Sequence, residues 1–212
     1  MKKKTLIGSL LFVALFSAFV AVLARGPNFE LAWAREVPSK ETVEAVAAGY
    51  RDTRNWPVFH HALKKVSLFD NGKPVEGFER IIPGMTAIFV IEPKDKQWKR
   101  FEIKAEVLPP KPGEAFRFRM LEESSGKTTR LLDGLEWWFG VRPATEAEKK
   151  SGNLSYTVGG ATAFTKTGRA RFLGRLSPKI LMNQIYPVDL VRLANFTTNL
   201  ESWAKESDPV YR

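Results

Sequence analysis

Apolar and polar residues alternate along most of the chain after residue 28, which is the pattern of strands with one buried face. The clearest row is 101–107, where apolar residues are separated by Glu102, Lys104 and Glu106. Similar rows occur at 29–36, 66–70, 86–91, 116–120, 135–141 and 156–164. The pattern predicts an antiparallel sheet of about seven strands that turns one face toward a core.

The apolar spacing becomes helical in residues 177–205. Ser177 can cap a helix, whereas Pro187 predicts a kink or a new start. Beyond this proline the apolar positions are Leu190, Leu193, Phe196, Leu200 and Ala204. With the N-terminus set aside, the helix has no helical partner of similar length, so it must lie against a strongly curved sheet. The sequence therefore predicts an α+β fold with a cavity between the sheet and a long C-terminal helix.

Three local signals add detail to this outline. Asn71-Gly72 between two apolar runs predicts a tight hairpin turn. Ser39 predicts the N-cap of a short helix after the first strand. Gly159-Gly160 predicts a bulge or a sharp bend in its strand.

The N-terminus differs from the rest of the chain. Three lysines at 2–4 precede an uncharged apolar run at 5–24, which is long enough as a helix to span about 30 Å. The run predicts a transmembrane helix in 1–24, with the lysines cytoplasmic and the remainder on the far, periplasmic or extracytoplasmic side. The alternative is a cleaved signal peptide and a secreted protein, since Val22-Leu23-Ala24 resembles a cleavage site.

These boundaries divide the chain into four parts. A linker at 25–28 follows the apolar run, one globular domain covers 29–206, and a short tail covers 207–212. One domain agrees with the chain length of 212 residues.

Composition excludes several kinds of chemistry. The chain has no cysteine, which removes thiolate catalysis, disulfides and cysteine metal sites. His60 and His61 are its only histidines, and neighbouring helical residues point about 100° apart, so this pair alone does not predict a metal site. No cofactor is expected. The net charge of +10 comes without a nucleic-acid-binding motif or a basic face interleaved with aromatic residues, so no nucleic acid partner is expected.

Positive charge is concentrated toward the end of the chain. Residues 151–188 contain no Asp or Glu. The basic residues there include Lys166, Arg169, Arg171, Arg175 and Lys179. We predict that they attract anionic lipid headgroups at a membrane surface. The alternative is an ordinary solvated end of the sheet.

Three segments resemble one known family. Residues 54–59 resemble its Asn/Arg-Trp-Pro-x-aromatic segment, residues 134–162 resemble its penultimate strand pair, and residues 189–196 resemble its Asp-Leu-x-Arg-x-Leu-Ala-Asn-Leu motif, with Phe196 in place of the last Leu. The family is the START-like (SRPBCC) superfamily, which includes polyketide cyclase/dehydrase-type proteins. Its bacterial members often carry one membrane span directly before the first strand. The resemblance implies a helix-grip fold with a hydrophobic cavity, but no single activity.

The inward rows supply the candidate residues for a cavity. The predicted ligand-binding residues are Trp56, Phe59, His60, Phe101, Ile103, Phe118, Trp137, Phe139, Tyr156 and Phe196. Trp56 has a second interpretation, as a plug at one end of the sheet. The residues match no fixed catalytic constellation, so no catalytic residue is assigned and binding is favoured over catalysis.

Three functions follow from these patterns. The leading hypothesis is a membrane-anchored domain that binds a hydrophobic ligand, either a lipid or an isoprenoid-like molecule. The second is a cyclase- or dehydratase-type enzyme that uses His60 or a carboxylate of the cavity as acid and base. The third is an accessory or scaffold protein whose cavity is filled. The sequence makes no prediction of the oligomeric state.

Overall fold

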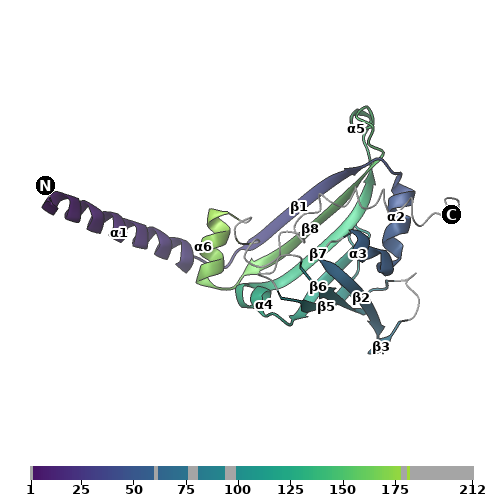
Figure 1. Cartoon of the computed structure of the whole chain (residues 1–212), viewed down its shortest axis with the longest axis horizontal. Coiled ribbons are helices and arrows are strands. Elements are labelled where there is room, and N and C mark those ends of the chain that lie inside the picture. Colours follow the sequence, from purple (N-terminus) through teal and green to yellow (C-terminus); the bar gives the residue numbers. More distant parts are fainter. Residues whose placement is uncertain (1, 60–61, 76–80, 94–98, 178–180, 182–212) are drawn as a thin grey trace.

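A computed structural model describes residues 2–59, 62–75, 81–93, 99–177 and 181. Within these residues one antiparallel sheet has eight strands in the order β1-β8-β7-β6-β5-β4-β2-β3. Figure 1 shows the sheet as a long slanted layer with short helices at its ends. The strands are β1 (Glu30–Ser39), β2 (Leu63–Asp70), β3 (Lys73–Pro74), β4 (Thr86–Ile91), β5 (Phe101–Leu108), β6 (Phe116–Glu123), β7 (Leu132–Pro143) and β8 (Ser155–Thr165). The two-residue strand β3 accounts for the difference from the predicted number.

One face of the sheet, called the inner face below, carries the core. The predicted rows are confirmed: Phe101, Ile103, Ala105 and Val107 of β5 are all less than 7% exposed. Their cross-strand neighbours on β4 are Ile91, Phe89 and Ala87, which are equally buried. The charged residues between them lie on the outer face. The alternation of apolar and polar residues therefore predicted the buried positions correctly in the centre of the sheet.

The hairpin turn between β2 and β3 is also confirmed. Asn71 and Gly72 both have positive φ, 46° and 79°, as a tight primed turn requires.

A bulge or a sharp bend was predicted at Gly159-Gly160, and the bulge is wrong. Strand β8 pairs without a register shift with β1, and both glycines pair with β7 as well. Their neighbours on β7 are Phe139 and Trp138, whose large side chains share a face with each glycine and compensate for the missing ones. The register shift lies instead in β7, around Gly134, whose φ is +58°.

Short helices between β1 and β2 close one end of the inner face. They are α2 (Val43–Arg51), η1 (Thr53–Asn55) and α3 (Trp56–Phe59), and Figure 1 shows α2 and α3 together at this end. Thr42 caps α2, so the cap predicted at Ser39 is wrong. Strand β1 continues through Ser39, which is buried opposite Ser155 and accepts a hydrogen bond from the Glu41 amide.

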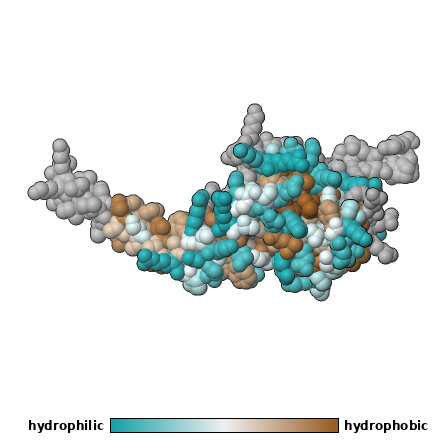
Figure 2. Space-filling model, turned by 90° about the horizontal axis from the view of Figure 1, so that it is seen from below, coloured by the Kyte–Doolittle hydropathy of each residue, from teal (hydrophilic) through white to brown (hydrophobic). Residues whose placement is uncertain are grey.

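The remaining helices are α1 (Lys2–Arg25), α4 (Lys127–Leu131), α5 (Glu146–Lys149) and α6 (Gly168–Leu176). Figure 1 shows α1 projecting away from the sheet beyond α6. Several large apolar side chains along α1 are exposed, and Figure 2 shows hydrophobic colour along its described part. Among the described residues, no helix is long and apolar enough to cross a membrane. The predicted membrane localisation is therefore wrong.

The predicted C-terminal helix lies outside the described residues, apart from its start. Helix α6 ends at Leu176 with Ser177 as its C-cap, and the Ser177 carbonyl also accepts a 3.2 Å hydrogen bond from the amide of helical Leu181, as predicted for a residue that begins the next helix. Leu181 is fully buried and lies close to Gly174 of α6, beside Phe29 and Leu31. Leu181 therefore lies near the start of β1.

Candidate ligand-binding face

Trp56 is the centre of the inner face. It is 2% exposed, and its indole Nε1 donates a 2.8 Å hydrogen bond to the backbone oxygen of Tyr50. This bond ties α3 to the end of α2 and satisfies the only polar atom of the indole. The Trp56 ring contacts Phe139 edge-on, with centroids 5.1 Å apart, and stacks with Phe89 at 6.2 Å.

Further aromatic residues extend this cluster across the strands. Phe118 is fully buried and meets Phe89 edge-on at 5.3 Å, while Trp137 stacks on Phe118 at 5.5 Å. The ring centroid of Phe116 lies 5.7 Å from that of Trp56. We call Trp56, Phe89, Phe116, Phe118, Trp137 and Phe139 the aromatic cluster. Phe116 and Trp137 are only partly buried, so they retain surface that the rest of the core does not cover.

Strand β8 presents a different surface beside this cluster. Its inward positions are all small: Ser155, Thr157, Gly159, Ala161, Ala163 and Thr165. The neighbouring strand β7 carries Trp137, Phe139 and Val141 at the matching positions. We call these six residues of β8 the small-residue row. The inner face therefore combines an aromatic side on β4, β6 and β7 with a side on β8 whose own inward residues are all small and buried.

Tyr50 of α2 stands where the two sides meet. It is 1% exposed, and its ring centroid lies 4.9 Å from that of Phe139. Burial raises the pKa of Tyr50 well above its usual value. The phenol therefore keeps its proton at neutral pH and is not a base there.

Glu123 is a buried carboxylate that the alternation pattern misses. Strict alternation from Phe118 would turn Glu122 inward, but a register shift between β5 and β6 places Glu123 opposite Ile103 instead. Glu123 is 5% exposed. It accepts hydrogen bonds from the Ser125 hydroxyl and, at 2.8 Å, from the Thr128 amide, so its function in this structure is to hold the turn before α4.

Solved structures confirm the fold. Norcoclaurine synthase of Thalictrum flavum is 12% identical and matches with a TM-score of 0.51 over 84% of this chain and 99% of its own. The Zhui aromatase/cyclase from Streptomyces sp. R1128 is 11% identical, with a TM-score of 0.50 over 87% of this chain and 98% of its own. The chain has the helix-grip fold. Identities this low show the fold alone.

A third structure gives the same fold in a larger protein. The di-domain aromatase/cyclase StfQ of the steffimycin biosynthetic pathway is 12% identical, with a TM-score of 0.50 over 82% of this chain. The chain spans about half of StfQ, 52% of its length. No protein-family model matches the sequence, and neither does any curated protein.

The helix-grip domain brings together most of the predicted ligand-binding residues. The buried inward residues among them are Trp56, Phe101, Ile103, Phe118 and Phe139, and Trp137 is partly buried beside them. The side chain of Phe59 and all of His60 and Phe196 lie outside the described residues. Tyr156 is not brought together with the others, because Ser155 and Thr157 occupy the inward positions and Tyr156 faces outward.

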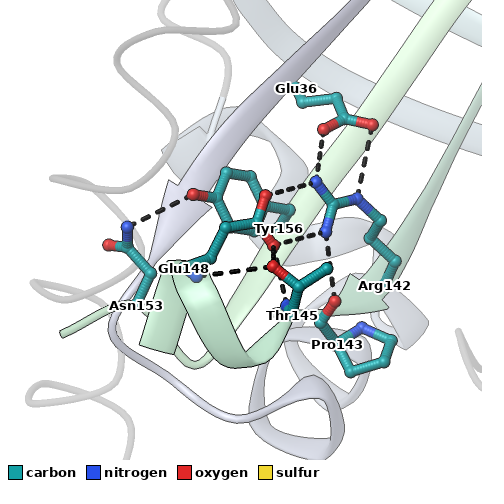
Figure 3. A network of polar contacts seen from close by, with 7 residues as sticks. All are labelled: Glu36, Arg142, Pro143, Thr145, Glu148, Asn153 and Tyr156. Atoms are coloured by element: carbon teal, nitrogen blue, oxygen red, sulfur yellow. Dashed lines mark hydrogen bonds and ion pairs between the residues drawn. The ribbon is translucent and has the colours of Figure 1, made fainter. Parts of the chain in front are cut away.

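Tyr156 belongs to a polar network on the outer face (Figure 3). Its ring lies under the Arg142 guanidinium, 4.3 Å from the ring centroid. Arg142 pairs with Glu36 of β1 and with Glu148 of α5, whose carboxylate also accepts from the Thr145 amide at 2.7 Å. The network ties β1, β7 and the loop around α5 together, and its charges are satisfied internally.

The network predicts a pH dependence of stability. Arg142 and the Thr145 hydrogen bonds hold the pKa of Glu148 at about 2, below its ordinary value of 4.5. Because the pKa of Glu148 is lower in the folded state than in the unfolded chain, the ionised carboxylate stabilises the fold at pH values above about 4.5. This contribution to the free energy of unfolding is lost as the pH falls from about 4.5 through 2. We expect Glu148→Gln to flatten the dependence of the melting temperature on pH in this window. Glu146→Gln, at an exposed carboxylate, is the control; equal pH profiles for both variants would contradict the assignment.

The predicted membrane-surface residues are partly engaged within the molecule. Arg171 donates from Nε to the Ala24 carbonyl at 2.7 Å, and Arg175 donates to the Leu23 and Pro27 carbonyls. These guanidinium groups therefore satisfy carbonyls at the C-terminal end of α1. Lys166 is exposed and reaches the Thr129 carbonyl at 3.3 Å. Arg169 is exposed, and Lys179 lies outside the described residues. A role of this set at a lipid surface stays a prediction.

Proposed function

We propose that the chain binds a hydrophobic small molecule, of lipid or isoprenoid-like character, on the inner face of its helix-grip domain. The observation that supports this best is the partly buried edge of the aromatic cluster beside the small-residue row. Phe116, Trp137 and Val141 pack against the core and are only partly buried. Ligand sites of this kind are mostly apolar with few polar groups, as is the described inner face.

The titratable groups of the described residues favour binding over acid and base catalysis. The carboxylates with lowered pKa, at Asp52, Glu114, Glu136 and Glu148, are all paired with arginines. On the described inner face, Tyr50 has a pKa too high for a base and Glu123 is held by Ser125 and Thr128. No described group on this face therefore combines a shifted pKa near neutrality with an open position.

Two fold relatives are aromatase/cyclases, so cyclase-type chemistry is the second candidate. The norcoclaurine synthase structure holds a transition-state analogue, which shows that this fold can enclose a small molecule in an enzyme. For this chain the cyclase hypothesis needs an acid or base beyond the described inner-face residues, such as His60.

A neutral fluorescent probe tests the proposal. We expect 1-N-phenylnaphthylamine to bind the purified full chain with a Kd in the micromolar range, and Trp137→Ala to weaken binding about tenfold or more because the side chain borders the inner-face surface. Trp138→Ala is the matched control, since Trp138 lies on the opposite face of the same strand and should leave Kd unchanged.

Native mass spectrometry of the purified chain complements the titration. A co-purifying hydrophobic molecule would support binding, and its chemical conversion by the protein would favour the cyclase-type alternative. The absence of probe binding, together with equal behaviour of the Trp137 and Trp138 variants, would favour a scaffold protein with a filled core.

A further inference from the structure

Two arginines of α6 contact the end of α1, and Figure 1 shows the two helices meeting at one end of the sheet. Arg171 donates from Nε to the Ala24 carbonyl at 2.7 Å and from Nη1 to the Asn28 side-chain oxygen at 2.6 Å. Arg175 follows four residues later. Residues four apart lie on the same face of a helix, so both guanidinium groups reach the junction from the same side.

Arg175 binds the chain on both sides of Gly26. Its two terminal nitrogens donate to the Leu23 carbonyl and, at 3.1 Å, to the Pro27 carbonyl. Its guanidinium also lies over the ring of Phe29, 5.1 Å from the centroid. A Cβ at Gly26 would come within 2.3 Å of Nη1 of Arg175. The missing side chain therefore allows the guanidinium to lie directly against the backbone.

These contacts satisfy backbone groups that the helix leaves open. The last four carbonyls of an α-helix have no partner within the helix, and positive charge is favourable at that end. Helix α1 ends at Arg25, so the carbonyls of Leu23 and Ala24 belong to this group. An arginine has five N–H donors in one plane, so each side chain can bind the helix end and the segment after it at once.

Helix α6 is itself packed closely on the sheet. Its buried residues are Ala170 and Gly174, one turn apart. A Cβ at Gly174 would lie 3.1–3.3 Å from atoms of Phe29, Leu31 and Leu181, so α6 lies against the first residues of β1 with little room between them. The two arginines therefore connect α1 to a part of the core, and not to a loose surface segment.

We propose that Arg171 and Arg175 form a clasp that joins α1 rigidly to the helix-grip domain and protects the peptide bond after Arg25 from proteases in the folded chain. Arg25 is exposed, but a protease acts on a segment that has opened locally, and here the residues on both sides of the bond are held by α6. The clasp gives α1 a fixed direction relative to the inner face. It requires no ligand, so the inference goes beyond the proposed function.

Limited trypsin digestion of the full chain, followed by intact mass spectrometry, tests the protection. The product to be measured begins at Gly26. We expect the double variant Arg171→Gln/Arg175→Gln to be cut after Arg25 at least about tenfold faster than the parent, because several hydrogen bonds that oppose local opening are lost. Cleavage after Lys150, in the exposed turn that follows α5, is the internal reference and should not change.

Arg130→Gln is the matched control, since it makes the same change at an exposed arginine of α4. It should alter the rate of cleavage after Arg25 by less than about twofold. Equal rates for the parent and the double variant would overturn the clasp.

Gly26→Ala tests the same contact without a change in α6. Its φ is not positive, so alanine fits the backbone, but the added methyl group must displace the Arg175 guanidinium. We expect faster cleavage after Arg25, similar to that of Arg175→Gln alone. Thermal melting compares all variants with the parent, and Gly26→Ala provides the answer if the arginine variants fail to fold. Cleavage of Gly26→Ala at the parent rate would then overturn the clasp.

Spin labels test the rigid connection, because the chain has no cysteine that would interfere. Labels at Leu15→Cys on α1 and Glu146→Cys on α5 occupy exposed positions in the two parts, and Asp133→Cys with Glu146→Cys is the reference pair within the domain. Double electron–electron resonance on labelled chains diluted with unlabelled protein should give one narrow distance for both pairs. The double arginine variant should lose the narrow distance for the first pair only. A broad distribution for the first pair in the parent would overturn the rigid connection.

Discussion

Trp56→Ala is expected to lower the free energy of unfolding by about 3–5 kcal/mol, as large-to-small changes of buried aromatic residues do. Trp56 is 2% exposed and contacts rings from β4, β6 and β7, so its removal leaves a cavity between the helices and the sheet. The loss also releases the Tyr50 carbonyl from its hydrogen bond. This is a large part of the total stability of a domain, about 5–15 kcal/mol. Urea unfolding followed by circular dichroism measures it.

Two controls separate packing from the hydrogen bond. Trp56→Phe keeps most of the ring and loses the indole donor, so it should destabilise less than the alanine variant. Trp138→Ala removes the same side chain from the outer face, where it is only partly buried, and should cost less than half as much. Equal unfolding midpoints for Trp56→Ala and Trp138→Ala would show that Trp56 is not packed at the centre of the inner face.

Arg117→Met is expected to be the most destabilising change on the outer face, by about 3–5 kcal/mol. Arg117 is 7% exposed and pairs with Glu114 at 2.6 Å and Glu136 at 2.7 Å. Hydrogen bonds from Arg117 hold the pKa of the Glu114 carboxyl below its ordinary value against the opposing effect of burial. Without the guanidinium, Glu114 becomes a buried carboxylate with its main partner removed. Unfolding in urea at pH 7 measures the loss.

The pH dependence and a neighbouring arginine provide the controls. Protonation of Glu114 at low pH removes the unpaired charge, so the difference between Arg117→Met and the parent should shrink as pH falls below 4.5. Arg119→Ala removes a side chain that is 48% exposed and also pairs with Glu136, and should cost about 1 kcal/mol or less. If both variants unfold at the same urea concentration, the buried ion pair contributes nothing beyond a surface one.

The ion pair of Arg117 with Glu114 depends on the position of the loop between β5 and β6. Gly140 on β7 has no side chain, and a Cβ there would come within 2.3 Å of the Gly113 carbonyl. The loop before β6 can therefore lie against β7, where the Ala115 amide donates to the Phe139 carbonyl at 2.8 Å. Close approach at one glycine thus brings Glu114 within reach of Arg117. Neither the alternation pattern nor the charge distribution predicted this contact.

Predictions from the sequence were least successful where one extra residue in a strand reverses which of its side chains face the core. The shift between Lys104 and Ala105 turns Glu123 inward, and no composition signal marks it. Tyr156 was predicted at the ligand site, but Ser155 and Thr157 take the inward positions of its strand. In both cases the side-chain direction depends on register with a neighbouring strand, which is a property of the sheet.

By itself, the sequence determined the class of fold, the inward rows of the central strands and the hairpin at Asn71-Gly72, because periodicity and turn chemistry act over a few neighbouring residues. Only the tertiary structure decided how distant residues are paired. Arg171 donates to the Ala24 carbonyl of α1 from 147 positions away, Tyr50 of α2 packs against Phe139 of β7, and Arg142 joins Glu36 to Glu148. Such contacts depend on strand order and register, which bring together segments whose separation in the chain carries no information about their distance in space.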